Sequence, residues 1–184
     1  LQTTLRWTAD GSDLRNDLLI FMLSYATDRA YRGVGDMPPL GIRMMASLEL
    51  ALSAGELKLS STDPDEQPFL DYRYFQQEED LRRMREAVRL CVSFGEHERF
   101  NDIIESRIEP TEEEVASDES LNTYILKEVT TGQHISGTCK MGPDSDDMAV
   151  VNQFGRVRGI QNLRIVYASI MPDCIRANTT VTTM

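Results

Sequence analysis

The chain has 184 residues, which suits one domain or slightly more, and 41% of them are hydrophobic, which is enough to form a core. Asp and Glu number 30 against 19 Lys and Arg, so the formal net charge is −11. Such an acidic surface repels phosphate backbones and anionic lipid, so we expect no nucleic-acid and no membrane partner.

Four segments among the first sixty residues have strand character. Residues 4–8 form a candidate short strand that a turn at residues 10–13 follows, and residues 18–23 are a continuous apolar run of strand length. Residues 42–50 have mixed apolar character, and residues 56–60 alternate polar with apolar side chains, as half-buried strands do. Together these segments predict a sheet.

The loop at residues 32–39 contains two glycines with the spacing that begins a phosphate-binding turn. Pro38 stands where the third glycine of that motif would be, and no helix can follow Pro38 and Pro39 in that register. We therefore expect no dinucleotide-binding turn at this point.

The clearest helix is predicted at residues 78–94, with Gly95 expected as its C-terminal cap. Apolar residues recur in it at three- and four-residue spacing and predict an inward face, made of Leu81, Met84, Val88 and Cys91. His97 lies just beyond this helix among charged residues, so we expect it at the surface.

Shorter elements follow the long helix. Residues 103–108 are a candidate strand, residues 110–114 open an acidic helix, and a further helix begins at residue 117. The inward residues of that last helix are expected to be Leu121, Tyr124, Ile125 and Val129. Residues 163–167 are predicted to form a buried strand. Strands interleaved with a long helix indicate an α+β fold, an antiparallel sheet backed by helices.

The cysteines Cys91, Cys139 and Cys174 are odd in number and widely spaced. No Cys-x-x-Cys pair exists, so we expect neither a metal site nor a disulfide framework. A reducing compartment is the default for such a chain, and we see no signal peptide at its start, so a cytoplasmic location is expected.

One of the two histidines, His134, precedes a glycine-flanked turn, Gly137-Thr138-Cys139, that can hold backbone against a ligand. An imidazole is suited to take a proton near neutral pH, although a buried histidine bonded to backbone fits the same pattern. Cys139 could act as a nucleophile beside His134, but a packed free thiol is the simpler interpretation.

Asn178 precedes Thr179-Thr180-Val181 and fits the N-cap of a helix. The N-terminus of a helix also presents free backbone N–H groups to an electron-rich partner. Both interpretations of Asn178 stay open on these residues alone.

Two clusters near the C-terminus, read in order, resemble the C-terminal signature of the glucose–methanol–choline (GMC) family of flavin oxidoreductases. The matching residues are His134, Gly137-Thr138-Cys139, Met141-Gly142, Val150-Val151-Asn152, Arg156-Val157-Arg158-Gly159, Leu163-Arg164, Ala168-Ser169-Ile170-Met171-Pro172 and Asn178-Thr179. Upstream, residues 55–60, Asp63-Pro64 and Asp71-Tyr72 are similar to the core of the family's substrate domain. The resemblance implies a substrate-binding domain at residues 1–131 and, at 132–184, a catalytic segment that belongs to an FAD-binding Rossmann-like domain.

Members of this family oxidise alcohols by passing a hydride to FAD. The resemblance implies that His134 accepts the hydroxyl proton and that Asn178 is its partner on the same oxygen. It also implies contacts with the cofactor from Tyr167, Ala168, Asn178, Thr179 and Thr180. A base and a second hydrogen-bonding group on the alcohol oxygen would stabilise the negative charge that develops as the hydride leaves.

Two residues depart from the family pattern. Tyr167 stands where an acid is usual, which weakens a side-chain contact with the flavin there but leaves backbone contacts from Ala168 possible. Asn152 replaces a common aspartate, which is a milder change.

The sequence has no strand–glycine turn–helix unit for a dinucleotide. It begins at Leu1 rather than Met and stops a few residues into an expected helix, so we expect a piece of a longer protein. An N-terminal FAD-binding half would be its partner, with a small alcohol as substrate and a homo-oligomer possible, and the piece alone is expected to be colourless and inactive. The alternative is a noncatalytic binding or interaction domain derived from the same fold, which the Tyr167 departure favours.

Overall fold

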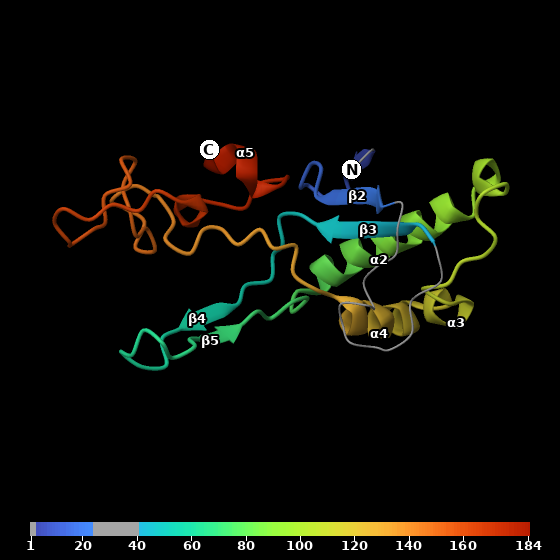
Figure 1. Cartoon of the computed structure of the whole chain (residues 1–184), viewed down its shortest axis with the longest axis horizontal. Helices are drawn as coiled ribbons and strands as arrows, with labels where there is room; N and C mark the ends of the chain where they lie inside the picture. The colour runs from blue at the N-terminus through green and yellow to red at the C-terminus, as the bar shows by residue number, and fades with distance from the viewer. Residues whose placement is uncertain (1–2, 24–40) are drawn as a thin grey trace. The chain divides into compact units, whose positions relative to one another are not determined.

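A computed structural model describes residues 3–23 and 41–184 (Figure 1). The chain divides into two compact units, Leu1–Val129 and Thr130–Met184. The loop predicted at residues 32–39 lies outside the described residues.

The first unit is built on a three-stranded antiparallel sheet of order β1-β2-β3. The strands are β1 (Thr4–Trp7), β2 (Leu18–Leu23) and β3 (Arg43–Leu48). β2 is the central strand, with Trp7 and Leu48 both opposite Leu18. Its first three residues are buried, as its unbroken apolar sequence predicts.

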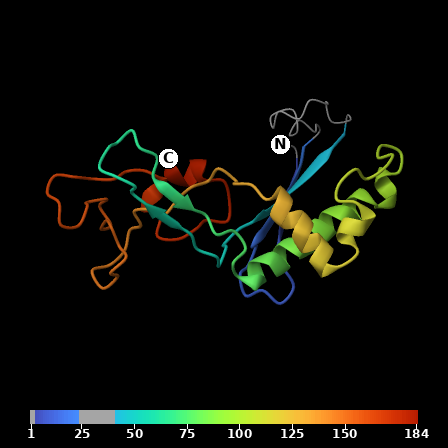
Figure 2. The same ribbon diagram turned by 90° about the horizontal axis from the view of Figure 1, so that it is seen from below.

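The long helix α2 (Glu78–Gly95) lies between the sheet and a second helix, α4 (Asp118–Glu128), as Figures 1 and 2 show. Ala87 packs with Leu18 on the sheet side, while Leu81 packs with Leu121 and Ile125 on the α4 side. Cys91 is largely enclosed, and burial raises the pKa of its thiol to about 11, which fits a packed core residue that stays protonated. This unit therefore has the predicted α+β arrangement of an antiparallel sheet backed by helices.

A buried ion cluster joins α2 to two loops of the same unit. The guanidinium of Arg83 contacts Asp17 at 3.0 Å and Asp80 at 2.6 Å, and all three side chains are buried. Asp17 also accepts from the backbone N–H of Ala9, and Asp80 accepts from that of Ser53. The cluster thus ties the β1–β2 loop and the segment after β3 to one face of α2.

A separate two-stranded sheet pairs β4 (Glu56–Lys58) with β5 (Phe69–Asp71) in antiparallel register. Gly55 precedes β4, and a Cβ atom there would lie only 2.1 Å from the carbonyl oxygen of Asp71. The close approach of the two backbones explains why a glycine begins this hairpin.

Short helical elements complete the first unit. His97 is exposed, and its Nδ1 accepts from the backbone N–H of Arg99 at the start of the 3-10 helix η1 (Glu98–Phe100). Thr111 and Ser117 each form a capping box, at the N-termini of α3 (Glu112–Val115) and α4. On α4, Leu121 and Ile125 are buried and Tyr124 packs beside them, as the spacing predicts.

The second unit is mostly loop, with the 3-10 helix η2 (Ala168–Ile170) and the short helix α5 (Thr179–Thr183). Its buried residues include Val151, which is bridged to both Met141 and Val157, and Ala168 and Met171 around η2.

Three predicted features are wrong. Gly95 is the last residue of α2, and the C-cap is Glu96, with φ −91° and ψ 0°. Residues 103–108 form no strand, and Ile103 is 72% exposed. Residues 163–167 form a single bridge, at Arg164, rather than a buried strand, and Val166 is 83% exposed. An apolar run becomes a strand only where another segment pairs with it over several residues. Residues 103–108 have no such partner among the described residues, and residues 163–165 pair with the short segment 155–157 alone.

Candidate active site

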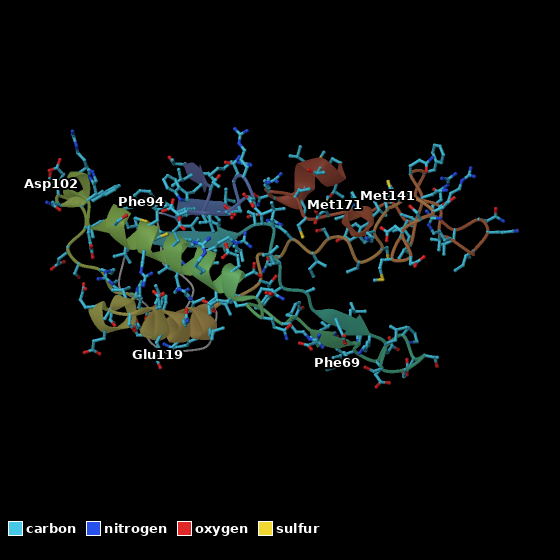
Figure 3. All side chains as sticks on the ribbon, turned by 180° about the vertical axis from the view of Figure 1, so that it is seen from behind. Phe69, Phe94, Asp102, Glu119, Met141 and Met171 are labelled. Carbon is cyan, nitrogen blue, oxygen red and sulfur yellow. The ribbon has the colours of Figure 1, made fainter. Side chains whose placement is uncertain are left out.

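Backbone hydrogen bonds join the two C-terminal clusters that the sequence singles out. The N–H groups of Cys139 and Met141 donate to the carbonyl oxygens of Ser169 and Ile170, each at 2.9 Å. Figure 3 labels Met141 and Met171, which lie on these two segments near η2. The clusters therefore form one local structure within the second unit.

Gly137 makes the turn that leads from His134 into this pairing. Its φ is +77°, a left-handed conformation that residues other than glycine rarely adopt. Its N–H donates to the carbonyl oxygen of Ala168 at 3.3 Å. A Cβ atom at this position would also lie 3.4 Å from the carbonyl oxygen of Met171. The glycine thus lets the loop bearing His134 lie close to η2.

The side chains of His134 and Asn178 meet. Asn178 Nδ2 lies 2.9 Å from His134 Nε2, and both residues are exposed on the second unit. The carboxamide makes no cap hydrogen bond, although Asn178 does occupy the N-cap position of α5. The capping role proposed from sequence is therefore wrong for this side chain, which binds the imidazole instead.

Thr179, the first residue of α5, reaches the other ring nitrogen of the histidine. Its Oγ1 lies 3.5 Å from His134 Nδ1. Sequence reasoning placed Thr179 in a cofactor contact and did not detect this side-chain relationship. Its position next to Asn178 could have indicated the contact, because the backbone of a residue adjacent to one that hydrogen-bonds an imidazole also lies near the ring.

The remaining cofactor candidates lie around the same elements. Tyr167 precedes η2 in extended conformation with its side chain 66% exposed, while Ala168 is buried. The carbonyl of Ala168 accepts from both Gly137 and Met171, so its N–H is the backbone group with which it could contact another molecule. Thr180 is exposed in the first turn of α5, where backbone N–H groups have no intrahelical acceptor.

Two further residues singled out from sequence, Asn152 and Cys139, form hydrogen bonds with backbone groups of the second unit. Asn152 Oδ1 accepts from the backbone N–H of Phe154 at 3.0 Å and of Arg156 at 3.1 Å, so the amide does the loop-forming work that an aspartate could also do. The N–H of Cys139 is taken by Ser169, and no pairing of its thiol with His134 is seen in the described second unit.

The described residues contain no cluster of His, Cys, Asp and Glu that could hold a metal ion. Over the same residues, no helix is long and apolar enough to cross a membrane.

Comparison with models of known protein families shows to which family the chain belongs. The model of the GMC oxidoreductase family matches residues 51–184. The chain belongs to the GMC oxidoreductase family. The match includes His134 and Asn178 and begins before the β4–β5 hairpin, so both units of this GMC chain contribute to it.

Curated relatives of the GMC chain are oxygen-dependent choline dehydrogenases. That of Proteus mirabilis (strain HI4320) is 35% identical over 132 residues, which are 72% of this chain and 23% of the relative. That of Cronobacter sakazakii (strain ATCC BAA-894) is 32% identical over 154 residues, 84% of this chain and 27% of the relative. The chain therefore spans about a quarter of the length of these proteins.

Solved structures share its fold. A variant of the formate oxidase of Aspergillus oryzae RIB40 has a TM-score of 0.79 at 25% identity, over 92% of this chain and 30% of that one. The pyridoxine 4-oxidase from Mesorbium loti has a TM-score of 0.77 at 20% identity, over 98% of this chain and 35% of that one, which is a likeness of fold.

Proposed function

We propose that this chain supplies the histidine–asparagine pair of an FAD-dependent oxidoreductase that oxidises a small alcohol. The observation that carries the proposal is the 2.9 Å approach of Asn178 Nδ2 to His134 Nε2 on an exposed surface. Membership of the GMC oxidoreductase family and the choline dehydrogenase relatives support it.

The chemistry of the pair suits an alcohol oxygen. A hydroxyl has one proton to donate and two lone pairs that accept, while an amide nitrogen only donates. An alcohol oxygen inserted between the two side chains would donate to His134 Nε2 and accept from Asn178 Nδ2. His134 would then take the proton, and Asn178 would stabilise the negative charge that develops on the oxygen. The two side chains would have to separate slightly to admit the substrate.

The residues present fit one side of an FAD site. When bound, FAD would supply the acceptor for the hydride that leaves the alcohol carbon. Asn178, Thr179 and Thr180 at the start of α5, the N–H of Ala168 and the exposed Tyr167 would contact it, since all are on or beside the elements that carry the pair. FAD occurs in the formate oxidase, a relative in which this cofactor is modified.

Most of the cofactor contacts would come from a Rossmann-like half encoded elsewhere in a longer protein, because this sequence has no dinucleotide-binding turn. We expect the isolated chain to be colourless and inactive. A flavin absorption band that stays with the purified chain after gel filtration would contradict this expectation.

The test of the proposed function is His134→Ala in the full-length protein. We expect turnover of alcohol to fall about 10³-fold, the range of a general base, while bound flavin per protein changes little. His97→Ala is the matched control, because it changes the only other histidine of the chain, an exposed one on the first unit. Comparable losses of turnover and flavin in His134→Ala would make the histidine a structural residue.

The second candidate, a noncatalytic domain that keeps this fold, rests on Tyr167 in place of the usual acid. A full-length protein that binds no flavin and has no Gly-x-Gly-x-x-Gly turn after a strand would favour it.

A further inference from the structure

The two ring nitrogens of His134 have different neighbours. Nε2 faces Nδ2 of Asn178 at 2.9 Å, and Nδ1 faces Oγ1 of Thr179 at 3.5 Å. Both neighbours come from the first two positions of one segment, at the start of α5.

The neighbour of Nε2 determines where the proton of a neutral ring lies. An amide nitrogen has hydrogens to donate and no lone pair to offer, so Nε2 is the acceptor in its contact with Asn178. The ring proton of neutral His134 is then on Nδ1, and the hydroxyl oxygen of Thr179 is the group placed to accept it.

We propose that Thr179 is a positioning residue that holds His134 in the tautomer with Nε2 unprotonated. The inference rests on the proposed function, in which Nε2 must accept the proton of the alcohol. A histidine in the opposite tautomer would present an N–H to the substrate and could not take its proton.

The surroundings of Thr179 suit this role. The carbonyl oxygen of Thr179 accepts a hydrogen bond from the hydroxyl of Thr183 at 2.7 Å, which stabilises the backbone of this helical turn. The side chain is branched at Cβ, which restricts rotation of the hydroxyl away from the ring. Thr179 is half-buried whereas His134 is exposed, so the threonine has less freedom of movement than a fully exposed residue would have.

The choice of a hydroxyl has a chemical consequence. Across the second unit as described, no carboxylate hydrogen-bonds to His134. A neutral hydroxyl orients the ring and selects its tautomer without adding the negative charge by which a carboxylate stabilises an imidazolium.

The test compares Thr179→Val with Thr179→Ser in the full-length flavoprotein labelled with ¹⁵N-histidine. The valine keeps the shape and removes the hydroxyl, while the serine restores it. Thr182→Val is the matched control, since it removes a hydroxyl from an exposed residue of the same helix that takes no part in either contact of the ring. The resonances of His134 are assigned by their loss in His134→Ala.

In the wild type and in Thr182→Val we expect imidazole ¹⁵N shifts that place the neutral ring proton on Nδ1. In Thr179→Val we expect the population with the proton on Nε2 to increase and kcat to fall about tenfold, measured per bound flavin, with KM little changed. Thr179→Ser should restore both the shifts and kcat, which a merely structural role would not require.

A wild-type proton on Nε2, or ring shifts that are the same in Thr179→Val, would overturn the role of Thr179. Full turnover in His134→Ala would instead reject the proposed function, whatever the ring shifts show. A fall in kcat that Thr179→Ser does not reverse would also count against the positioning role.

Discussion

The side-chain amide of Asn178 lies 2.9 Å from the imidazole of His134, although 44 residues separate the two in sequence. The amide therefore serves the histidine and not the helix it precedes, since Asn178 makes no cap hydrogen bond to α5. Asn178 occupies an N-cap position without making the usual cap hydrogen bond. Substituting it should therefore change the reaction rate much more than the stability of the protein.

Replacing Asn178 by Ala should reduce turnover by about 10²-fold, the cost of removing one donor from an oxygen that develops negative charge. It should leave stability almost unchanged, because the roughly 1 kcal/mol that a cap contributes is absent here. Steady-state kinetics and thermal unfolding of the full-length protein measure the two effects.

Ser117→Ala is the converse control for that experiment. Ser117 does accept from the backbone N–H of Ser120 in a capping box, so its loss should cost about 1 kcal/mol and leave turnover unchanged. An Asn178→Ala protein that loses stability as Ser117→Ala does, at full rate, would make Asn178 a cap after all.

Gly137→Ala should impair the loop that carries His134. An alanine at φ +77° costs about 1 kcal/mol or more, while its Cβ would make an ordinary contact of 3.4 Å with the carbonyl oxygen of Met171. We expect a lower melting temperature together with reduced turnover, because the 137–141 segment positions the histidine.

The matched control is Gly132→Ala, in the same loop. Gly132 lacks a left-handed φ, and a Cβ there would meet nothing within 4 Å. This variant should unfold and turn over as the wild type does. Equal effects of the two substitutions would show that Gly137 is not specially required.

Sequence predicts those elements whose burial pattern is decided locally. The unbroken apolar run of β2 and the three- and four-residue spacing along α2 both describe faces that must be covered, and both elements form where expected. Residues 103–108 have similar local composition but no pairing partner in the described chain, and residues 163–167 pair only with the short segment 155–157. No local pattern reveals the extent of such pairing.

The residues of the candidate site also fall into those that the sequence could predict and those that it could not. His134 and Asn178 could be singled out from the motif because their spacing along the chain is recognisable. The approach of Thr179 to Nδ1 depends on how the 137–141 segment pairs with η2, which is a three-dimensional relationship. The loss of the Asn178 cap has the same origin, since the imidazole competes for the amide.

Arg83→Met should be among the most damaging substitutions in the first unit. It would leave the buried carboxylates of Asp17 and Asp80 without their shared cation, which lowers the free energy of unfolding by about 3–5 kcal/mol. Urea unfolding of the protein measures the loss. Arg82→Met is the matched control on the preceding residue, whose ion pairs with Glu79 and Glu86 are partly exposed and worth about 1 kcal/mol or less. Similar losses in both variants would contradict a special role for the buried cluster.

The same cluster should make the fold sensitive to acid. Burial raises the pKa of Asp17 and of Asp80, but hydrogen bonds from Ser12, Leu52 and their neighbours outweigh it, so both pKa values lie below 3.8. The unfolded chain therefore binds protons at higher pH than the folded one. The stabilisation is fully present well above pH 3.8 and is lost as the pH falls through the lower folded values.

Asp80→Asn tests this dependence, because it keeps the shape of the side chain and removes its titration. The variant should be less stable than the wild type near neutral pH, since Arg83 loses one of its two anionic partners, and its unfolding free energy should fall less steeply below about pH 4. Urea unfolding at a series of pH values gives both slopes. Asp65→Asn, at an exposed turn, should keep the wild-type slope. An Asp80→Asn slope as steep as that of the wild type would mean that other carboxylates cause the acid sensitivity.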